Sequence, residues 1–309
     1  MRTAVIDLGS NTVRMTVYDG TEAGFTPILS QKEVVGLIGY TEDGMLTEDG
    51  ILRLTEAIRG FRATGGAVQV QRYGCFATAG LRAVRNADEV VRRIQAETGV
   101  EARVIGGEEE ARLDYAGAYR PAGLGRGLVV DMGGGSTELI RFDGEKALNT
   151  VSLPFGSLLL FRRFVGGILP GEKELRHIRH FVRKQLGCVE WLPGCASHAC
   201  LIGGTARAVA RLHREIFGRE HDPLQGYTFD AGDLRAMIRT LGDKKSAARL
   251  LTRVVPERIH SILPGMTGLL RIAGTAGCAT LSISLTGVRE GYLQQYMGGE
   301  DTPDAGTIL

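Results

Sequence analysis

Two segments of the chain repeat one pattern of apolar and polar positions. In residues 4–20 an apolar strand runs into Asp-x-Gly and small or polar residues, and a second strand then closes on an Asp-Gly turn. Residues 128–144 align with that segment without a gap. Because Asp-Gly after alternating apolar residues is a strong hairpin signal, each copy is predicted to form a β-hairpin. One copy starts each half of the chain, which predicts a duplicated α/β domain with a cleft between the halves.

The spacing of apolar residues predicts helices and strands along the rest of the chain. Thr47 is a predicted N-cap for a helix whose apolar face recurs every three or four residues between 51 and 61, and Asn86 with Glu89 resembles a capping box that starts another. The remaining predicted helices are 108–119, 172–186, 205–217, 231–241 and 247–255, and the remaining strands are 68–75, 102–105 and 197–202. Strands that alternate with helices indicate an α/β architecture.

The chain is long enough for two domains. Its 309 residues exceed one ordinary core and suit two domains of about 150 residues each. Residues 121–126 are rich in glycine and proline, which marks the predicted junction. We expect an N-terminal domain over 1–120 and a C-terminal domain over 121–309, with the last helix able to pack back on the first domain.

Composition narrows the class of protein. Apolar residues make up 43% and charged residues 23%, which is the balance of a soluble globular protein. The chain has no long apolar run, and its first residues lead straight into a strand pattern, so we expect no membrane span and a cytoplasmic location. The net charge of +2 neither requires nor excludes a polyanionic partner, and no nucleic-acid partner is expected.

The cysteines give no clear site. Five cysteines without paired spacing argue against a disulfide framework. Cys188, Cys195, His198 and Cys200 lie close together in sequence, but their spacing fits no common zinc pattern. Buried or loop thiols are the default interpretation.

Glycine is unusually abundant, and its 44 residues cluster after apolar strands, where the backbone turns tightly or approaches a ligand. Consecutive N–H groups in a Gly/Ser turn form an anion-binding nest, although one such turn is equally consistent with a tight hairpin. The repeat favours the nest, with phosphate-binding candidates at Gly9, Ser10, Asn11, Thr12, Gly133, Gly134, Gly135 and Ser136. Asp7 and Asp131 end the matching strands, and two such carboxylates suit a Mg²⁺ ion that keeps several waters.

The turns at 7–12 and 131–138 resemble the two phosphate loops of the acetate kinase/sugar kinase/Hsp70/actin superfamily. More narrowly, the chain is similar to the exopolyphosphatase/guanosine pentaphosphate phosphohydrolase family, through three further segments at 77–82, 107–112 and 287–291. These matches run from residue 4 to residue 293. The resemblance implies two actin-like, ribonuclease H-like domains with mixed sheets flanked by helices, an active site in the interdomain cleft, and a homodimer. The chain looks like the short, two-domain form of the family, without the helical and HD-type regions of longer members.

The resemblance also implies catalytic roles. The family's water-activating glutamate matches Glu110, and its phosphate-gripping arginine matches Arg82. Independently, a carboxylate in the first turn of a helix stays ionised beside the positive dipole end and can accept a proton, although acidic first turns more often only complement the dipole. The planar fork of an arginine binds oxyanions bidentately, and the alternative for Arg82 is a solvated arginine at a helix start.

Three further residues complete the predicted site. Glu138 joins Asp131 as a candidate ligand for Mg²⁺, or another divalent cation, or for its water shell. Gly204 and Thr205 lie in a segment that resembles the adenosine-side loop of the superfamily, and the alternatives there are a distal phosphate, a guanosine or a purely structural turn. His260 replaces the family's usual aspartate and is left out of the site.

Hydrolysis of the terminal phosphoanhydride bond of inorganic polyphosphate, with release of orthophosphate, is the favoured function. The alternatives are a guanosine pentaphosphate (pppGpp) 5′-phosphohydrolase, an ATP-dependent kinase or ATPase of the same superfamily, and a sensor that binds alarmone nucleotides without cutting them. A basic track for a long polyanion competes with ordinary solvated helix faces as the interpretation of nine cations: Arg162, Arg163, Arg176, Arg179, Arg183, Lys184, Arg207, Arg211 and Arg214.

Overall fold

The computed structural model describes residues 1–21, 24–122, 125–144 and 146–297, and the chain forms two compact units. Unit 1 comprises Met1–Pro121 and the segment that starts at Val288, and unit 2 comprises Ala122–Gly287. The first junction adjoins the boundary expected from the glycine and proline content. The segment from Val288 belongs to unit 1, whereas the expected boundaries placed it in the second domain with the option of packing back.

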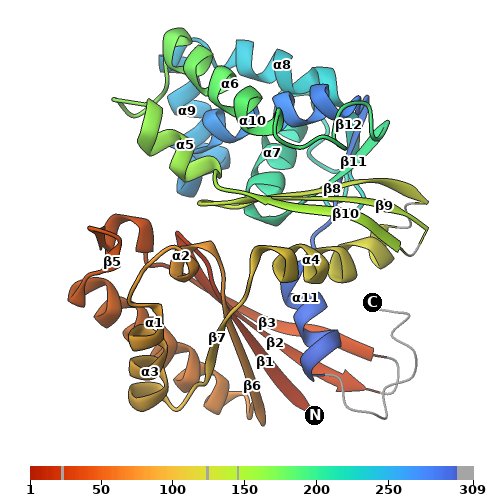
Figure 1. Ribbon diagram of the computed structural model, residues 1–309. Coiled ribbons are helices and arrows are strands. Elements are labelled where there is room, and N and C mark those ends of the chain that lie inside the picture. The colour runs from red at the N-terminus through yellow and green to blue at the C-terminus, as the bar shows by residue number, and fades with distance from the viewer. Residues whose placement is uncertain (22–23, 123–124, 145, 298–309) are drawn as a thin grey trace. The chain divides into compact units, whose positions relative to one another are not determined.

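Unit 1 is built on a five-stranded mixed sheet with the order β3-β2-β1-β6-β7 (Figure 1). The strands β1 (Arg2–Leu8), β2 (Thr12–Thr21) and β3 (Gly24–Val34) are antiparallel neighbours, and β6 (Arg72–Ala77) and β7 (Ala102–Val104) run parallel to β1. The central strand β1 is buried on both faces, with Ala4, Ile6 and Leu8 in one apolar cluster and Val5 in another. The short strands β4 (Thr41–Glu42) and β5 (Met45–Leu46) pair only with each other.

Helices cover both faces of this sheet. Apolar residues of α1 (Glu48–Ala67) and α3 (Ala87–Thr98) pack on one face, and those of α4 (Gly107–Ala122) and α11 (Val288–Tyr292) pack on the other. A 3₁₀ turn at Leu37–Tyr40, the short helix α2 (Ala79–Arg82) and a π-helical turn at Leu293–Met297 complete this unit as described. The N-cap prediction for α1 is confirmed, because Thr47 Oγ1 accepts a hydrogen bond from Gly50 N–H at 3.3 Å.

Two local predictions in unit 1 are wrong. The side chain of Asn86 does not cap α3; its Oδ1 accepts from Leu46 N–H at 2.9 Å and its Nδ2 donates to the Leu46 carbonyl at 3.0 Å. The strand expected over 68–75 begins only at Arg72, because α1 continues to Ala67 and the chain then turns through Gln69 with a φ of 58°. In the first case, Asn86 binds the backbone of the distant Leu46 instead of the start of α3. In the second case, α1 is longer than predicted and leaves fewer residues for the strand.

Unit 2 repeats the strand arrangement of unit 1 and adds an edge strand, in the order β10-β9-β8-β11-β13-β12. Its strands are β8 (Arg126–Met132), β9 (Thr137–Asp143), β10 (Lys146–Leu153), β11 (His198–Ile202), β12 (Thr228–Asp230) and β13 (Thr280–Ile283). The first three in sheet order are antiparallel, and β11 and β13 run parallel to β8. The predicted hairpin repeat is confirmed, since Asp7 pairs with Arg14 in one copy and Asp131 with Glu138 in the other.

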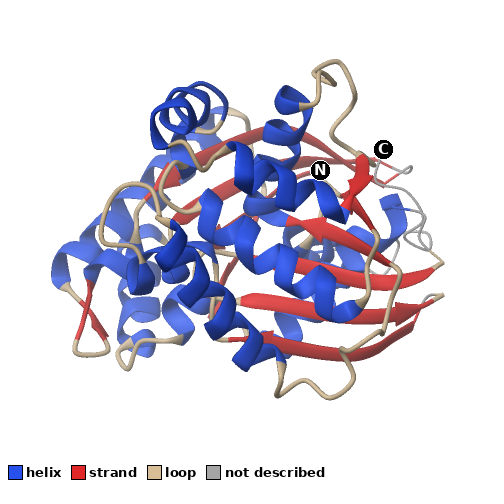
Figure 2. Cartoon of the chain, turned by 90° about the horizontal axis from the view of Figure 1, so that it is seen from above, coloured by secondary structure: helices blue, strands red, loops and turns tan. Residues whose placement is uncertain are grey.

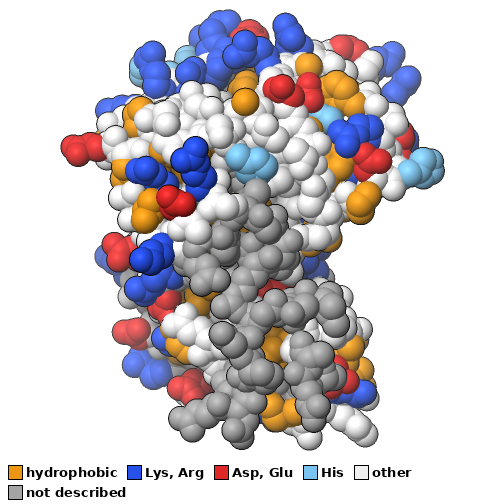
Figure 3. All heavy atoms as spheres, turned by 90° about the vertical axis from the view of Figure 1, so that its right-hand side faces the viewer, with side chains coloured by type: hydrophobic (Ala, Val, Ile, Leu, Met, Phe, Trp, Pro, Cys, Tyr) orange, Lys and Arg blue, Asp and Glu red, His pale blue; other side chains and the backbone are white. Residues whose placement is uncertain are grey.

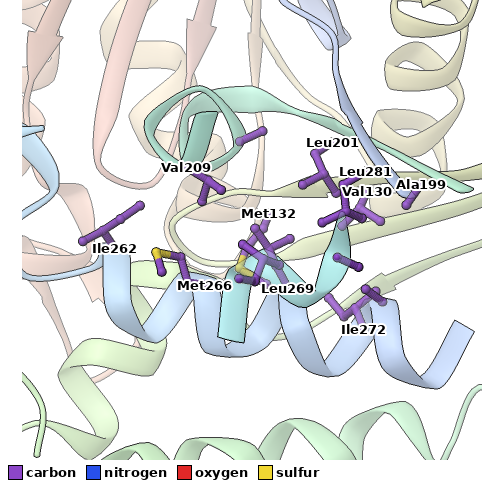
Figure 4. Packing of buried hydrophobic residues seen from close by; sticks show 14 of the residues in the cluster. Val130, Met132, Ala199, Leu201, Val209, Ile262, Met266, Leu269, Ile272 and Leu281 are labelled. Atoms are coloured by element: carbon purple, nitrogen blue, oxygen red, sulfur yellow. The ribbon is translucent and has the colours of Figure 1, made fainter. Parts of the chain in front are cut away.

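The helices of unit 2 lie over the strands (Figure 2). They are α5 (Ser157–Phe164), α6 (Glu172–Leu186), α7 (Gly203–Ile216), α8 (Ala231–Thr240), α9 (Lys244–Val254) and α10 (Ile262–Ala276), with a 3₁₀ turn at Pro256–Arg258. Figure 4 shows Met266 and Leu269 of α10 beside Met132 of β8. The helices α5, α6 and α8 pack on α10 in turn, so α10 forms the centre of the core. No helix in the described part of the chain is long and apolar enough to cross a membrane.

Candidate functional site

The first turn of α5 orients the second predicted phosphate loop. The carbonyl of Gly133 accepts from Ser157 N–H at 2.9 Å, and the carbonyl of Gly134 accepts from Leu158 N–H at 3.1 Å. In a planar trans peptide the N–H points opposite to the carbonyl of the same peptide. The N–H groups of Gly134 and Gly135 therefore point away from α5, side by side, as an anion-binding nest requires.

Both loops are closed by the same hydrogen bond. Gly9 N–H donates to the Thr12 carbonyl at 3.2 Å, and Gly133 N–H donates to the Ser136 carbonyl at 3.0 Å. These two N–H groups hold the turn and leave the following ones to face a ligand. The predicted binding residues thus share one backbone geometry in both units.

The first loop is fixed between the Leu37–Tyr40 turn and α2. The Ser10 carbonyl accepts from Ile38 N–H at 3.2 Å, which turns the Asn11 N–H to the opposite side. Gly80 of α2 approaches so closely that a Cβ at this position would lie 2.8 Å from the Ser10 Cα. Because only glycine fits this contact, Gly80 allows α2, which carries Arg82, to pack directly on the loop.

Arg82 and Glu110 are in direct contact. Nη1 of Arg82 donates to Glu110 Oε2 at 2.8 Å and to the Ile105 carbonyl at 3.0 Å. Glu110 is 7% exposed and lies in the first turn of α4. An ion pair requires an ionised carboxylate, and only that form can accept a proton from water. The two residues predicted to be catalytic, 28 positions apart in sequence, therefore form one unit.

The two other acidic residues of this helix start have different surroundings. Glu108 is exposed. Glu109 pairs with Arg103 and accepts a hydrogen bond from the Tyr296 hydroxyl at 2.6 Å. Both differ from Glu110, which alone of the three contacts Arg82.

Asp131 and Glu138 face each other across the second hairpin. Side chains opposite one another in an antiparallel pair have their Cβ atoms about 5 Å apart. Glu138 is 1% exposed, and its Oε1 accepts from Ser152 Oγ at 2.8 Å. The carboxylate of Asp131 lies against Gly203, whose φ is +80° and where a Cβ would collide with it. Two neighbouring carboxylates of this kind fit the sparse protein ligation of a hydrated Mg²⁺ ion.

Gly204 and Thr205 lie in the first turn of α7, which starts two residues earlier than the sequence predicts. Arg258 covers this turn: its Nη1 donates to Thr205 Oγ1 at 3.3 Å, and its guanidinium occupies the space of a Cβ at Gly204. Thr205 Oγ1 donates to Ser157 Oγ at 3.3 Å. Since Ser157 also bonds the second loop, Arg258 is linked to that loop through two hydroxyl groups.

Asp7, at the end of the first hairpin strand, has cationic neighbours. Nη1 of Arg289 lies 3.4 Å from Asp7 Oδ2, and Arg14 is its partner in register. The exposed fractions of the two side chains are 18% for Asp7 and 12% for Arg289. Burial raises the pKa of Asp7 above its ordinary value, and the two arginines oppose that shift. Next to Arg289, Glu290 accepts a hydrogen bond from the Tyr18 hydroxyl at 2.6 Å.

Sequence reasoning gave no site role to Arg258, Arg289 or Glu290. Arg289 and Glu290 lie in the segment 287–291, which the sequence marks only by its resemblance to a family. Arg289 contacts a residue 282 positions away, and Arg258 one 53 positions away. No local pattern reports such contacts.

The remaining candidates do not form a site in the described residues. No cluster of three or more His, Cys, Asp or Glu side chains there could hold a metal ion. His198 Nε2 lies 2.8 Å from Ser282 Oγ, and burial raises the pKa of Cys200 to about 11, which keeps that thiol protonated. The ring of His260 packs on that of Phe161, with centroids 5.2 Å apart, which is a structural contact.

Comparison with known proteins identifies relatives over nearly the whole chain. The family model described as Ppx/GppA phosphatase family matches residues 16–300. Exopolyphosphatase 1 of Mycobacterium tuberculosis is 33% identical over 313 residues, which cover 97% of this chain and 89% of that protein. Exopolyphosphatase 1 of Mycobacterium leprae is 32% identical over 308 residues, which cover 97% and 91% respectively.

Solved structures agree with this result. A Ppx/GppA enzyme of Aquifex aeolicus is 29% identical, with a TM-score of 0.76 and coverage of 95% of this chain and 98% of the other. An exopolyphosphatase of Cytophaga hutchinsonii shares the fold with a TM-score of 0.83, at 21% identity and coverage of 95% and 97%. The expected mixed α/β fold, with sheets flanked by helices, is confirmed.

Proposed function

Because the chain belongs to the Ppx/GppA phosphatase family, we propose that it is an exopolyphosphatase, which hydrolyses the terminal phosphoanhydride bond of inorganic polyphosphate and releases orthophosphate. Two mycobacterial relatives that bear this name match 97% of the chain. The proposal assigns separate tasks to the groups of each unit.

The observation that carries the proposal is the contact between Arg82 and Glu110. Glu110 accepts a proton from the attacking water, which then forms a bond to the terminal phosphorus as the bridging oxygen leaves with the rest of the chain. Arg82 holds the carboxylate in place and brings a guanidinium charge to the phosphate oxygens. The nests of both loops bind further phosphate oxygens through backbone N–H groups, whose orientation is fixed in advance by the α5 and Leu37–Tyr40 contacts.

A divalent cation fits the acidic pair of unit 2. Asp131 and Glu138 would hold Mg²⁺, which would offset the negative charge of the phosphates. The ion pair with Arg289 makes Asp7 a weaker candidate ligand than these two.

The decisive variant is Glu110→Gln, which keeps the size of the side chain and removes its ability to accept a proton. Activity on polyphosphate is expected to fall by about 10²–10⁴-fold, with binding of the substrate largely retained. Release of orthophosphate measures the first quantity, and equilibrium binding of labelled polyphosphate measures the second.

Glu108→Gln is the matched control, because Glu108 is an exposed residue of the same helical turn. It is expected to leave the rate unchanged. Near wild-type turnover by Glu110→Gln would show that another group is the base. Parallel assays with pppGpp and ATP test the substrate, since faster release of phosphate from either would contradict the assignment to polyphosphate.

A further inference from the structure

The formal charge of the chain is divided unequally between its units. The sequence range of unit 2 holds 22 Lys and Arg against 14 Asp and Glu, a formal charge of +8. The ranges of unit 1 hold 15 against 21, a formal charge of −6. The net charge of +2 therefore hides a strongly basic unit. Such a local excess attracts polyanions.

The outer face of α6 concentrates this charge. After Glu172, every exposed residue of the helix is basic, and these residues are Lys173, Arg176, His177, His180, Arg183 and Lys184. They recur every three or four positions, which places them on one side of the helix. With a rise of about 1.5 Å per residue, the row is ~16 Å long. The opposite side of α6 packs on α10 through buried apolar residues.

Acidic side chains offset little of this charge. Glu172 pairs with Arg179 at 2.7 Å and touches Arg176 at 4.0 Å. Glu174 turns back, where it accepts the N–H groups of Gly166 and Gly171 at 2.8 and 2.7 Å. Within the described residues, no carboxylate lies in ion-pair range of Lys173, Arg183 or Lys184.

Neighbouring helices extend the basic surface. Exposed cations continue on α8 and α9, at Arg235, Arg239, Lys244, Lys245 and Arg249. The N–H groups of Gly166 and Gly171 lower the pKa of Glu174, and the charge of Lys244 on α9 adds to this effect. Figure 3 shows Lys and Arg side chains gathered at the top of the view, over the helical part of unit 2, with a His side chain among them.

Helix α5 leads from the second phosphate loop to the basic surface. The first turn of α5 bonds that loop, and the last turn carries the exposed Arg162 and Arg163. The guanidinium of Arg163 lies 4.6 Å from the ring centroid of Phe181 on α6. The eight residues of α5 span about 12 Å. A polyanion that starts at the loop and follows α5 therefore meets Arg162 and Arg163 at the far end of the helix, beside α6.

We propose that Arg162, Arg163 and the outer face of α6 bind the distal phosphates of long inorganic polyphosphate. This inference rests on the proposed exopolyphosphatase function and adds a second binding site to it. A flexible polyanion with a charge on every unit suits a row of cations without specific pockets. Nucleic acid suits it less, because the outer face of α6 has no exposed Phe, Tyr or Trp on which bases would stack. The basic track considered from the sequence is thereby reduced, because two of its nine cations have partners elsewhere. Arg211 pairs with Glu257 at 2.7 Å, and Arg207 donates to the Leu285 carbonyl at 3.4 Å.

The test variant is Lys173→Gln/Arg183→Gln/Lys184→Gln, which removes three exposed cations from α6. The KM for long-chain polyphosphate is expected to rise about tenfold, and the slope of log KM against log salt to fall by about three. The kcat/KM for tripolyphosphate is expected to stay unchanged, because three phosphates reach no further than the loop. Equilibrium binding of end-labelled long-chain polyphosphate is measured on the same variant.

The matched control is Arg92→Gln/Arg126→Gln/Lys146→Gln, which removes the same charge from exposed positions elsewhere. It is expected to leave both substrates unaffected. An equal rise in the KM for long-chain polyphosphate in the control would show that the effect comes from net charge and not from a site on α6. Unchanged binding of long-chain polyphosphate by the α6 variant would also contradict the proposed site. Tighter binding of single-stranded poly(U) than of polyphosphate to the wild-type face would also overturn it. If the wild-type protein hydrolyses neither long-chain polyphosphate nor tripolyphosphate, the proposed function is wrong. The equilibrium binding of end-labelled polyphosphate still tests the proposed binding site on α6.

Discussion

The two copies of the hairpin each have an aspartate at the same position, but the charge of the residue opposite it differs. In unit 1, Asp7 has Arg14 opposite it in register and Arg289 at 3.4 Å. In unit 2, Asp131 has Glu138 opposite it. The loops have the same closing bond, so the backbone is not what separates the copies. A duplicated motif has thus become an ion pair in one unit and an acidic pair, suited to a cation, in the other.

The largest effect is expected from Arg289→Met, which removes the ion pair that distinguishes the unit 1 hairpin from the unit 2 hairpin. The change removes the guanidinium that pairs with Asp7 and stabilises the charge of Glu290, and it leaves Asp7 with the smaller influence of Arg14. Removal of one partner of a buried ion pair costs about 3–5 kcal/mol of the free energy of unfolding. Urea unfolding measures this loss. Arg92→Met, at an exposed position, is the control and is expected to change stability by less than about 0.5 kcal/mol.

The second-largest effect is expected from Asp131→Asn, which removes one carboxylate of the acidic pair in the unit 2 hairpin. Loss of one of the two carboxylates is expected to lower kcat by about 10²–10³-fold and to raise the Mg²⁺ concentration needed for half-maximal rate. Phosphate release across a Mg²⁺ titration measures both. Asp7→Asn is expected to leave the Mg²⁺ response unchanged. If Asp7→Asn shifts that response more than Asp131→Asn does, the roles of the two aspartates are reversed.

The smallest effect concerns Tyr18→Phe, which removes the hydrogen bond to Glu290. The loss is about 1.5–3 kcal/mol at pH 8, the usual range for a bond to a charged group. Burial and Glu290 raise the pKa of Tyr18 well above its ordinary value of 10. The unfolded chain therefore loses this proton first, and the stabilisation, complete below pH 10, is lost as pH rises through the native pKa. Wild-type stability is expected to fall more steeply above pH 10 than that of Tyr18→Phe, and parallel slopes would contradict this network.

The sequence predicted those parts of the fold that have local signals. The repeat gave both hairpins, and amphipathic spacing gave α1 and α6. The helix α10 was missed because strands and helices surround it, so its residues are apolar on all sides and show no stripe. For the site, sequence alone located the loops, and the family resemblance located Arg82 and Glu110. The different surroundings of Asp7 and Asp131 depend on Arg289 and Gly203, which distant parts of the chain supply.

The return of the C-terminal segment to unit 1 has a consequence for the order of folding during synthesis. Tyr18 and Glu290, which share a hydrogen bond, are 272 positions apart in sequence, and Leu293 and Met297 belong to the same apolar cluster as Val5. A growing chain cannot complete this half of the unit 1 core until residues 288–297 have left the ribosome. Unit 2 is continuous in sequence and needs no such delay. We therefore expect the second unit to reach its native state before the first, against the usual N-terminal-first order of domain folding.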